Sequence, residues 1–278
     1  MNILERMILM ENNTIHYIWL GKNEKPDIVK DCIKSWKEFF PDWKIVEWNE
    51  DNLNIDSIIY CKEAYDKKKY AFVSDYFRFL ILYKYGGLYF DTDVKVIKNF
   101  SDLIIENDLF FGFEDVKKVN PGLVLYSKNR KERLFKEILD IYIKEKFILE
   151  NGDLNLKTVV TRFTELLQKY GLQLNNKKQK IKNMTIFPTE YFCPLNYNTG
   201  RMCITDKTYA IHLYNGSWLN LEEKKEQEIY RYYYNKYSNK YLGDIIIRNI
   251  VRIISIYKVT GLTGVFNRIK KKILKINL

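Results

Sequence analysis

The chain has 278 residues, of which 46% are hydrophobic and 15% aromatic, so most of it is able to bury a core and extensive intrinsic disorder is excluded. Lys and Arg outnumber Asp and Glu by 46 to 35, a balance that ordinarily indicates a nucleic-acid or anionic-membrane partner. Eight of the basic residues and no acidic residue lie within residues 245–278, so the rest of the chain is nearly neutral. Because no P-loop or other nucleic-acid motif occurs, we do not expect a nucleic-acid binder.

The cysteines and the hydrophobic runs indicate a compartment. The four cysteines are widely scattered with no C-x-x-C pair, which indicates neither a zinc site nor a disulfide framework and favours a reducing, cytoplasmic environment. Charged residues interrupt residues 1–13, so a secretory signal is not expected. No run approaches the roughly 20 apolar residues of a membrane span.

The first elements in chain order form a βαβ unit. Residues 14–20 and 44–48 are β-branched and aromatic runs that predict strands, and the apolar spacing within residues 26–40 predicts a helix that ends at Pro41. A strand, a helix and a strand in so short a segment predict an α/β fold with a largely parallel sheet and covering helices.

Further helices and strands follow in alternation. Helices are expected at residues 62–69, 70–85, 132–143, 156–170 and 222–237, strands at 88–94, 109–113, 122–126, 185–187 and 209–214, and a solvated loop or sheet edge at 175–182. Pro121-Gly122 is expected to form a turn or a point of close backbone approach. With no internal repeat or linker, residues 1–240 are expected to form one α/β domain and residues 241–278 a basic tail.

Two carboxylates stand two residues apart near the end of the expected strand 88–94. Alternate side chains of a strand point to one side, so Asp91 and Asp93 should lie together at the carboxyl end of the strand, where open α/β sheets bind ligands. Paired carboxylates there suit Mg²⁺ or Mn²⁺. The same tripeptide is common in turns after strands, and spacing alone favours the turn.

Two further groups of polar residues accompany them. Asp75 and Arg78 lie three apart on an apolar helix, so they share a face and are either a structural ion pair or a ligand-binding pair. The late segment His212–Trp218 places an imidazole, an amide, a hydroxyl and an indole after a strand, where they suit a metal and a phosphate. A lone histidine at a strand end is more often structural.

Together these motifs resemble the DXD glycosyltransferases of glycosyltransferase family 32, which includes the yeast initiating α-1,6-mannosyltransferase and bacterial capsule enzymes. The resemblance rests on I-H-x-I-W at residues 15–19, S-D-x-x-R at 74–78, G-G-x-Y-x-D-x-D at 86–93 and H-x(4)-S-W at 212–218. It implies a GT-A fold, a Rossmann-like α/β sandwich, and metal-dependent transfer of a sugar from a nucleotide donor with retention of anomeric configuration.

The resemblance also implies roles for particular residues. It assigns Asp75, Arg78, Asp91 and Asp93 to catalysis, Ile18, Trp19, Asp75, Arg78, Tyr89, Asp91, Ser217 and Trp218 to the donor, and Asp91, Asp93, His212 and Asn215 to the metal. Whether His212 or Asn215 completes the metal shell is left open, because related enzymes differ. No carboxylate stands out as a nucleophile for a double displacement, so we expect a same-face mechanism in which the departing phosphate helps to deprotonate the acceptor.

The expected activity is therefore transfer of a hexose or N-acetylhexosamine from a UDP- or GDP-sugar, with UDP favoured, using Mn²⁺ or Mg²⁺. The acceptor is expected to be a glycan, lipid-linked, in capsular or surface polysaccharide synthesis. The alternatives are a non-catalytic nucleotide-sugar or membrane-surface binding protein, and a toxin-like enzyme that glycosylates a protein.

The basic tail has a second reading beside its charge. Apolar residues recur at helical spacing on one face, and Gly261 to Gly264 separates a second helix that ends in three consecutive lysines; the apolar set is Ile246, Ile250, Ile253, Ile254 and Tyr257. Such a pair of helices suits an anchor on the anionic inner face of the cell membrane. A C-terminal helix packed on the body with a solvated basic edge is the equal alternative.

Overall fold

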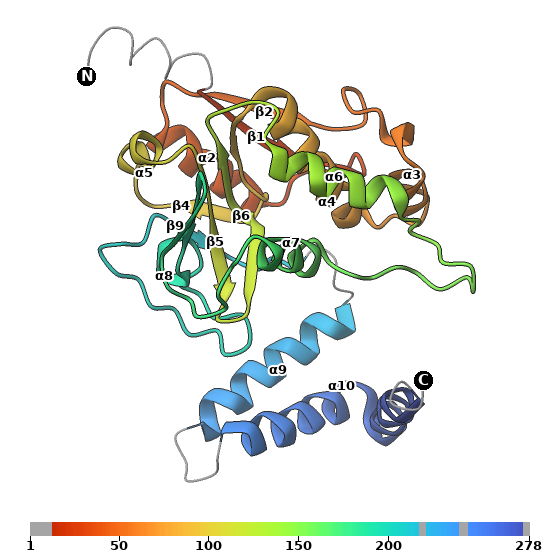
Figure 1. Ribbon diagram of the computed structural model, residues 1–278. Coiled ribbons are helices and arrows are strands. Elements are labelled where there is room, and N and C mark those ends of the chain that lie inside the picture. The colour runs from red at the N-terminus through yellow and green to blue at the C-terminus, as the bar shows by residue number, and fades with distance from the viewer. Residues whose placement is uncertain (1–12, 217–220, 239–243, 275–278) are drawn as a thin grey trace, which may run out of the picture. The chain divides into compact units, whose positions relative to one another are not determined.

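The computed structural model describes residues 13–216, 221–238 and 244–274. Figure 1 shows that the chain divides into two compact units. Met1–Leu195 and Cys203–Asn215 make up the first, and Asn196–Met202 and Gly216–Leu278 make up the second. The expected functional division into residues 1–240 and 241–278 stays a prediction.

The first unit contains all of the strands of the described residues and most of the helices. The strands are β1 (Thr14–Ile18), β2 (Lys44–Trp48), β3 (Gly87–Tyr89), β4 (Val94–Val96), β5 (Leu109–Asp115), β6 (Lys118–Ser127), β7 (Gln179–Ile181), β8 (Met184–Phe187) and β9 (Ala210–His212). The helices are α2 (Asp27–Phe39), the short 3-10 turn Ile55–Ser57, α3 (Ile59–Asp66), α4 (Tyr70–Tyr85), α5 (Ser101–Glu106), α6 (Arg133–Lys144), α7 (Val159–Lys169) and α8 (Thr189–Phe192).

Seven strands form one mixed sheet in the order β2-β1-β3-β6-β5-β8-β7. The pairings β1 with β2, β1 with β3 and β5 with β8 are parallel, while β6 is antiparallel to both of its neighbours and β7 to β8. Five strands therefore run in one direction, which confirms a mostly parallel sheet. The reversals arise because β5 and β6, like β7 and β8, are joined by short hairpins instead of crossover helices.

Helices pack on both faces of this sheet, which confirms the expected α/β sandwich. On one face Trp36 of α2 packs against Tyr17 and Phe90, with ring centroids 5.5 and 5.4 Å apart. On the other, Phe163 of α7 packs against Phe111 of β5 with centroids 4.9 Å apart, in a core shared with α3, α4 and α6. Alternate strand residues point to opposite faces, so both layers are buried.

Two expected elements differ from the structure around the site. The single strand expected at residues 88–94 is wrong, because the chain leaves the large sheet after Tyr89 and β4 pairs instead with β9 in a second, two-stranded sheet. The backbone N–H of Val96 donates to Ser35 and the Trp36 indole donates to the carbonyl of Val94, so α2 holds β4 in this place. Pro121-Gly122 lies inside β6, and the hairpin turn comes earlier, at residues 116–117.

The second unit contains α9 (Leu221–Tyr237) and α10 (Asp244–Leu274), which Figure 1 draws in light and dark blue. Tyr234 of α9 packs against Ile247 and Val251 of α10 in a small buried core. The helix α10 is broken at Gly261, whose φ of 67° is left-handed, so the expected division of the tail into two helices is confirmed. Among the described residues, no helix is long and apolar enough to cross a bilayer.

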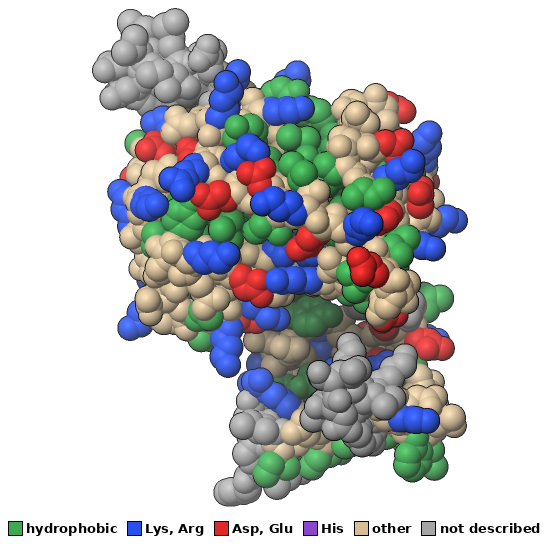
Figure 2. Space-filling view, turned by 45° about the vertical axis from the view of Figure 1, so that its right-hand side comes forward, with side chains coloured by type: hydrophobic (Ala, Val, Ile, Leu, Met, Phe, Trp, Pro, Cys, Tyr) green, Lys and Arg blue, Asp and Glu red, His purple; other side chains and the backbone are tan. Residues whose placement is uncertain are grey.

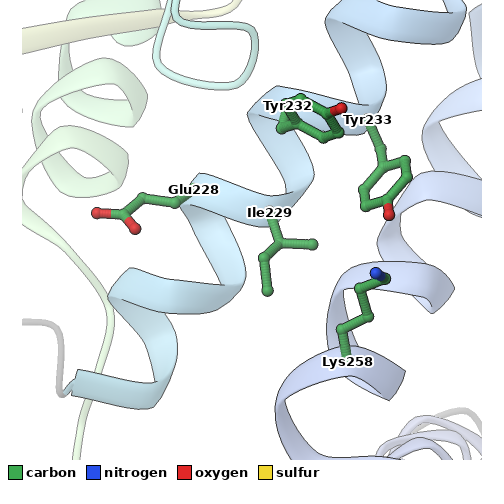
Figure 3. A pocket seen from close by; sticks show the side chains of 5 residues that line it. All are labelled: Glu228, Ile229, Tyr232, Tyr233 and Lys258. Atoms are coloured by element: carbon green, nitrogen blue, oxygen red, sulfur yellow. The ribbon is translucent and has the colours of Figure 1, made fainter.

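An open pocket lies between α9 and α10 (Figure 3). Its lining residues are Glu228, Ile229, Tyr232 and Tyr233 of α9 and Lys258 of α10. The Lys258 ammonium lies 5.2 Å from the centroid of the Tyr233 ring, a cation–π contact that joins the two helices.

Candidate active site

The helix α4 places Asp75 and Arg78 one turn apart in the core of the first unit. The Nη2 of Arg78 donates to the Oδ1 of Asp75 at 2.9 Å, and both side chains are buried. The other terminal nitrogen of Arg78 donates to the Oδ2 of Asp91 at 3.2 Å. One guanidinium therefore joins two carboxylates, Asp75 on α4 and Asp91 in the loop after β3, with one terminal nitrogen directed to each. The planar, multi-donor guanidinium of arginine suits such a bridge.

Tyr89, the last residue of β3, contacts both Arg78 and Asp91. Its ring centroid lies 5.1 Å from the guanidinium carbon of Arg78, and its hydroxyl donates to the Oδ1 of Asp91 at 2.9 Å. Both oxygens of Asp91 are thus occupied by donors, and the carboxylate of Asp91 is directed at Arg78.

Burial and charge oppose each other in this group. Burial raises the pKa of Asp75 to about 6, although the neighbouring Arg78 charge acts against that shift. Burial also disfavours the charged form of Arg78, but the negative charges of Asp91 and Asp75 outweigh it and hold the pKa of Arg78 above its usual value. The arginine therefore stays charged, and the two carboxylates compete for it.

Gly122 of β6 approaches this group with its backbone. The backbone N–H of Asp91 donates to the carbonyl of Gly122 at 3.0 Å, and a Cβ on Gly122 would lie 1.9 Å from the Oδ2 of Asp91 and 2.8 Å from the Nη1 of Arg78. No side chain fits there without moving the ion pair. The close backbone approach expected at Pro121-Gly122 is therefore confirmed.

The antiparallel pairing of β4 with β9 brings Asp93 and His212 together. The Nε2 of His212 lies 3.1 Å from the Oδ1 of Asp93, and the backbone N–H of Asn215 donates to the Oδ2 at 2.9 Å. Asp93 and His212 are 6% and 3% exposed, so little solvent screens the pair. The intervening Tyr214 has a φ of 53°, a left-handed conformation that turns the chain back toward Asp93.

The two members of this pair stabilise each other's charge. Burial alone would raise the pKa of Asp93, but His212 and the Asn215 N–H outweigh it and lower that pKa. Burial would lower the pKa of His212, and Asp93 instead holds it well above the usual value. The Cys193 thiol is a further neighbour of the His212 imidazole and also raises its pKa.

Asp91 and Asp93 thus do not act as one strand-aligned pair. Asp91 faces Arg78 and Tyr89, whereas Asp93 faces His212 and the turn that follows it. The expectation that both point to one side of a strand is wrong, because the chain changes sheets between them.

Asp93 and His212 offer two ligands for a divalent ion. No group of three or more His, Cys, Asp or Glu side chains able to hold a metal occurs among the described residues. Mg²⁺ and similar ions are commonly held by one or two protein ligands together with water and substrate phosphates, so the Asp93 carboxylate and the His212 imidazole suffice as a donor set. His212 would have to lose a proton to become a ligand.

The remaining predicted donor-site residues lie in different settings. Ile18 is buried in the core that also contains residues of α3 and α4, so its role is structural. Trp19 is half-buried, and its indole N–H donates to the carbonyl of Asn23 at 2.8 Å. Ser217 and Trp218 lie outside the described residues.

A third group at this edge was missed by the sequence analysis. Glu114 is the penultimate residue of β5, and Asn120 lies near the start of β6. The Asn120 Nδ2 donates to the Oε1 of Glu114 at 3.3 Å. The only sequence signal was an acidic residue that directly follows the apolar run LFFGF, before the N-P-G segment. It becomes visible only when the hairpin is formed.

Residues 26–110 match the family described as "Glycosyltransferase sugar-binding region containing DXD motif". This region includes Asp75, Arg78, Asp91 and Asp93. This part of the chain therefore matches the DXD sugar-binding region of glycosyltransferases.

The chain is also similar to individual known proteins. The chain is 26% identical over 220 residues to "Uncharacterized glycosyltransferase L373" of Acanthamoeba polyphaga mimivirus, and the match covers 74% of this chain and 83% of that protein. Among solved structures it is similar to a glycosyltransferase involved in glycosylation of the major capsid of PBCV-1, with 11% identity, a TM-score of 0.45, and 77% and 98% of the two chains covered. It is also similar to GlyE of Streptococcus pneumoniae TIGR4, with 14% identity, a TM-score of 0.43, and 86% and 63% covered.

Proposed function

We propose that this glycosyltransferase moves a hexose or N-acetylhexosamine from a nucleotide diphosphate sugar to a glycan acceptor, with retention of configuration. The observation that supports it most directly is the Arg78 guanidinium joined to Asp75 and Asp91 beside the Asp93–His212 pair. The first group offers charged hydrogen-bonding partners for sugar hydroxyls, and the second offers ligands for the metal of a diphosphate.

The residues would divide the work between binding and charge stabilisation. Asp93 and His212 would hold the ion, with Asn215 supporting Asp93 through its backbone N–H. Bound Mn²⁺ or Mg²⁺ would stabilise, as a Lewis acid, the charge that grows on the leaving diphosphate. Arg78 would hold Asp91 and Asp75 in fixed orientation toward the donor, so that little reorganisation is needed when the sugar leaves.

We propose a UDP-sugar as the donor and Trp19, Ser217 and Trp218 as further donor contacts. A half-buried indole at the carboxyl end of β1 is placed like a stacking residue for a nucleobase. Screening UDP- and GDP-sugars for Mn²⁺-dependent hydrolysis tests the proposal. Turnover of at least one sugar is expected, whereas binding without turnover in the whole panel would favour the non-catalytic alternative.

We further propose a lipid-linked acceptor at an anionic cytoplasmic membrane surface, in polysaccharide synthesis. In α10 four apolar side chains at helical spacing are each about half exposed: Ile246, Ile250, Ile253 and Tyr257. Exposed cations flank them at Arg252 and Lys258. An apolar stripe edged by cations is typical of helices that lie in the interface of an anionic bilayer.

The charge of the first unit does not favour a general affinity for polyanions, so we propose that the basic excess of residues 245–278 acts locally. On the face of the first unit visible in Figure 2, Lys and Arg side chains are interspersed with Asp and Glu. No field of one sign covers that face, so we propose no nucleic-acid partner.

A further inference from the structure

Glu114 lies at the edge of the sheet where the other site residues gather. Because β5 runs parallel to β3, with the antiparallel β6 between them, both strands end at the same edge. Asp91 follows the end of β3, Glu114 lies at the end of β5, and Asn120 enters that edge at the start of β6. The topology therefore brings a third carboxylate to the ligand-binding edge.

Hydrogen bonds connect Glu114 to the DXD segment. Asn120 donates to the Glu114 carboxylate at 3.3 Å and accepts the backbone N–H of Gly122 at 2.7 Å. Gly122 in turn accepts the backbone N–H of Asp91 at 3.0 Å. Asn120 is buried, so it is a fixed support that positions Glu114 relative to Asp91.

The carboxylate of Glu114 is not used by the fold as an ion pair. No Lys, Arg or His side chain lies within ion-pair distance of it in the part of the chain that the structure describes. Burial raises the pKa of Glu114, with His212 and Asn120 acting against that shift. Asn120 and the Tyr214 hydroxyl are its hydrogen-bond partners. A half-buried carboxylate held by neutral donors, without a cation at ion-pair distance, is able to accept a proton.

A buried phenol borders the same carboxylate. The Tyr214 hydroxyl is a hydrogen-bond partner of the Glu114 carboxylate, and it lies 3.0 Å from the Sγ of Cys193. Tyr214 lies between His212 and Asn215 in the left-handed turn. Glu114 is thus placed between the Asp91 side and the Asp93–His212 side of the site.

We propose that Glu114 is the acceptor-side carboxylate, which orients the incoming hydroxyl and takes its proton. This inference rests on the proposed glycosyl transfer. On the face of the sugar from which the diphosphate departs, the acceptor oxygen forms a bond to the anomeric carbon, so the configuration is retained. The bond from that carbon to the diphosphate oxygen breaks with its electron pair remaining on the diphosphate. The hydroxyl proton passes to a Glu114 carboxylate oxygen, and in donor hydrolysis water takes the place of the acceptor.

The test uses the full chain with Mn²⁺ and the nucleotide sugar that the wild type hydrolyses fastest. Glu114→Gln keeps the size and the hydrogen bond from Asn120 but removes the base, so kcat should fall by about 100-fold or more, while the donor KM changes little. Glu114→Asp keeps a carboxylate on a shorter side chain and should recover part of the lost kcat.

The order of the two variants separates a chemical role from a structural one. A structural role favours the isosteric Gln over Asp, whereas proton transfer favours Asp over Gln. Asp115→Asn, which removes the exposed neighbouring carboxylate, is the matched control and should keep the wild-type kcat.

Three results would overturn the assignment: an unchanged kcat in Glu114→Gln, a weaker donor KM that accompanies the fall in kcat, or a Gln variant faster than the Asp variant. The departing diphosphate would then be the group that takes the proton. A wild type that hydrolyses no nucleotide sugar would instead refute the proposed glycosyl transfer itself.

Discussion

Gly122 and Asp91 approach so closely that an added methyl group at Gly122 would lie 1.9 Å from the Oδ2 of Asp91. The contact is between a strand of the large sheet and the first aspartate of the DXD motif, and it leaves the Arg78–Asp91 ion pair no room to shift toward β6. Backbone packing therefore determines the orientation of Asp91.

Gly122→Ala should displace Asp91 and weaken its contact with Arg78. Because the overlap lies in a packed interior, we expect the free energy of unfolding to fall by about 1–3 kcal/mol and donor hydrolysis to fall with it. Urea unfolding and hydrolysis rates measure the two effects. Gly152→Ala is the control: Gly152 has a left-handed φ of 81° with open space around its Cα, so alanine there should lower stability and leave the specific activity intact. Full activity in Gly122→Ala would contradict the steric argument.

His16, one of the two histidines, has a structural role. Its Nε2 lies 3.1 Å from the carbonyl of Gly86, and the Trp48 indole N–H donates to its Nδ1 at 3.1 Å, so the ring is neutral and joins β1, β2 and the end of α4. Burial lowers the pKa of His16 from 6.5 to about 4.

The pH dependence of stability should report this histidine. Between pH 6.5 and 4 the unfolded chain binds the proton and the folded chain does not, so the stability that His16 contributes is complete above pH 6.5 and is lost as the pH falls toward 4. The shift corresponds to about 3 kcal/mol at most. Urea unfolding at several pH values should show a flatter profile for His16→Gln than for the wild type. Parallel profiles would mean that His16 titrates normally in the folded protein.

The site shows which features are predictable from local sequence. The apolar helix at residues 70–85 was predictable because it ends at Gly86-Gly87. The contact of Asp75 with Arg78 was predictable because residues three apart share a helix face. The pairing of Asp93 with His212 was predictable only from family resemblance, because the two residues are far apart in the sequence and a local pattern does not specify strand partners.

Long-range strand pairing accounts for what was not predictable. Periodicity treats residues 88–94 as one strand, but β4 is withdrawn from the large sheet by its pairing with β9 and its contacts to α2. Glu114 has no local signature, because its significance depends on the direction of β5 relative to β3. The separate partners of Asp91 and Asp93, and the position of Glu114, therefore both follow from long-range strand pairing.

The apolar stripe of α10 should bind anionic vesicles. Replacing Ile250 and Ile253 with Asp removes apolar area and adds negative charge on side chains that are already half exposed, so folding should be little affected while binding to phosphatidylserine-containing vesicles is lost. Vesicle co-sedimentation at low and high salt measures the effect, with pure phosphatidylcholine vesicles for comparison. Ile105→Asp, an exposed isoleucine on α5, is the control. Equal binding of the double variant and the wild type would contradict a membrane role for this stripe.

The most direct measurement of the central claim is the Mn²⁺-dependent rate of nucleotide-sugar hydrolysis in the wild type and in Asp93→Ala. Removing this carboxylate takes away the Asp93–His212 donor set, and the loss of one electrostatic contact to a developing charge typically lowers kcat by about 100- to 1,000-fold. Asp51→Ala, at an exposed aspartate, should keep the wild-type rate. The account predicts hydrolysis that requires Mn²⁺ or Mg²⁺ in the wild type and has a kcat lower by about that factor in Asp93→Ala. Metal-independent turnover, or an Asp93→Ala variant as fast as the wild type, would contradict it.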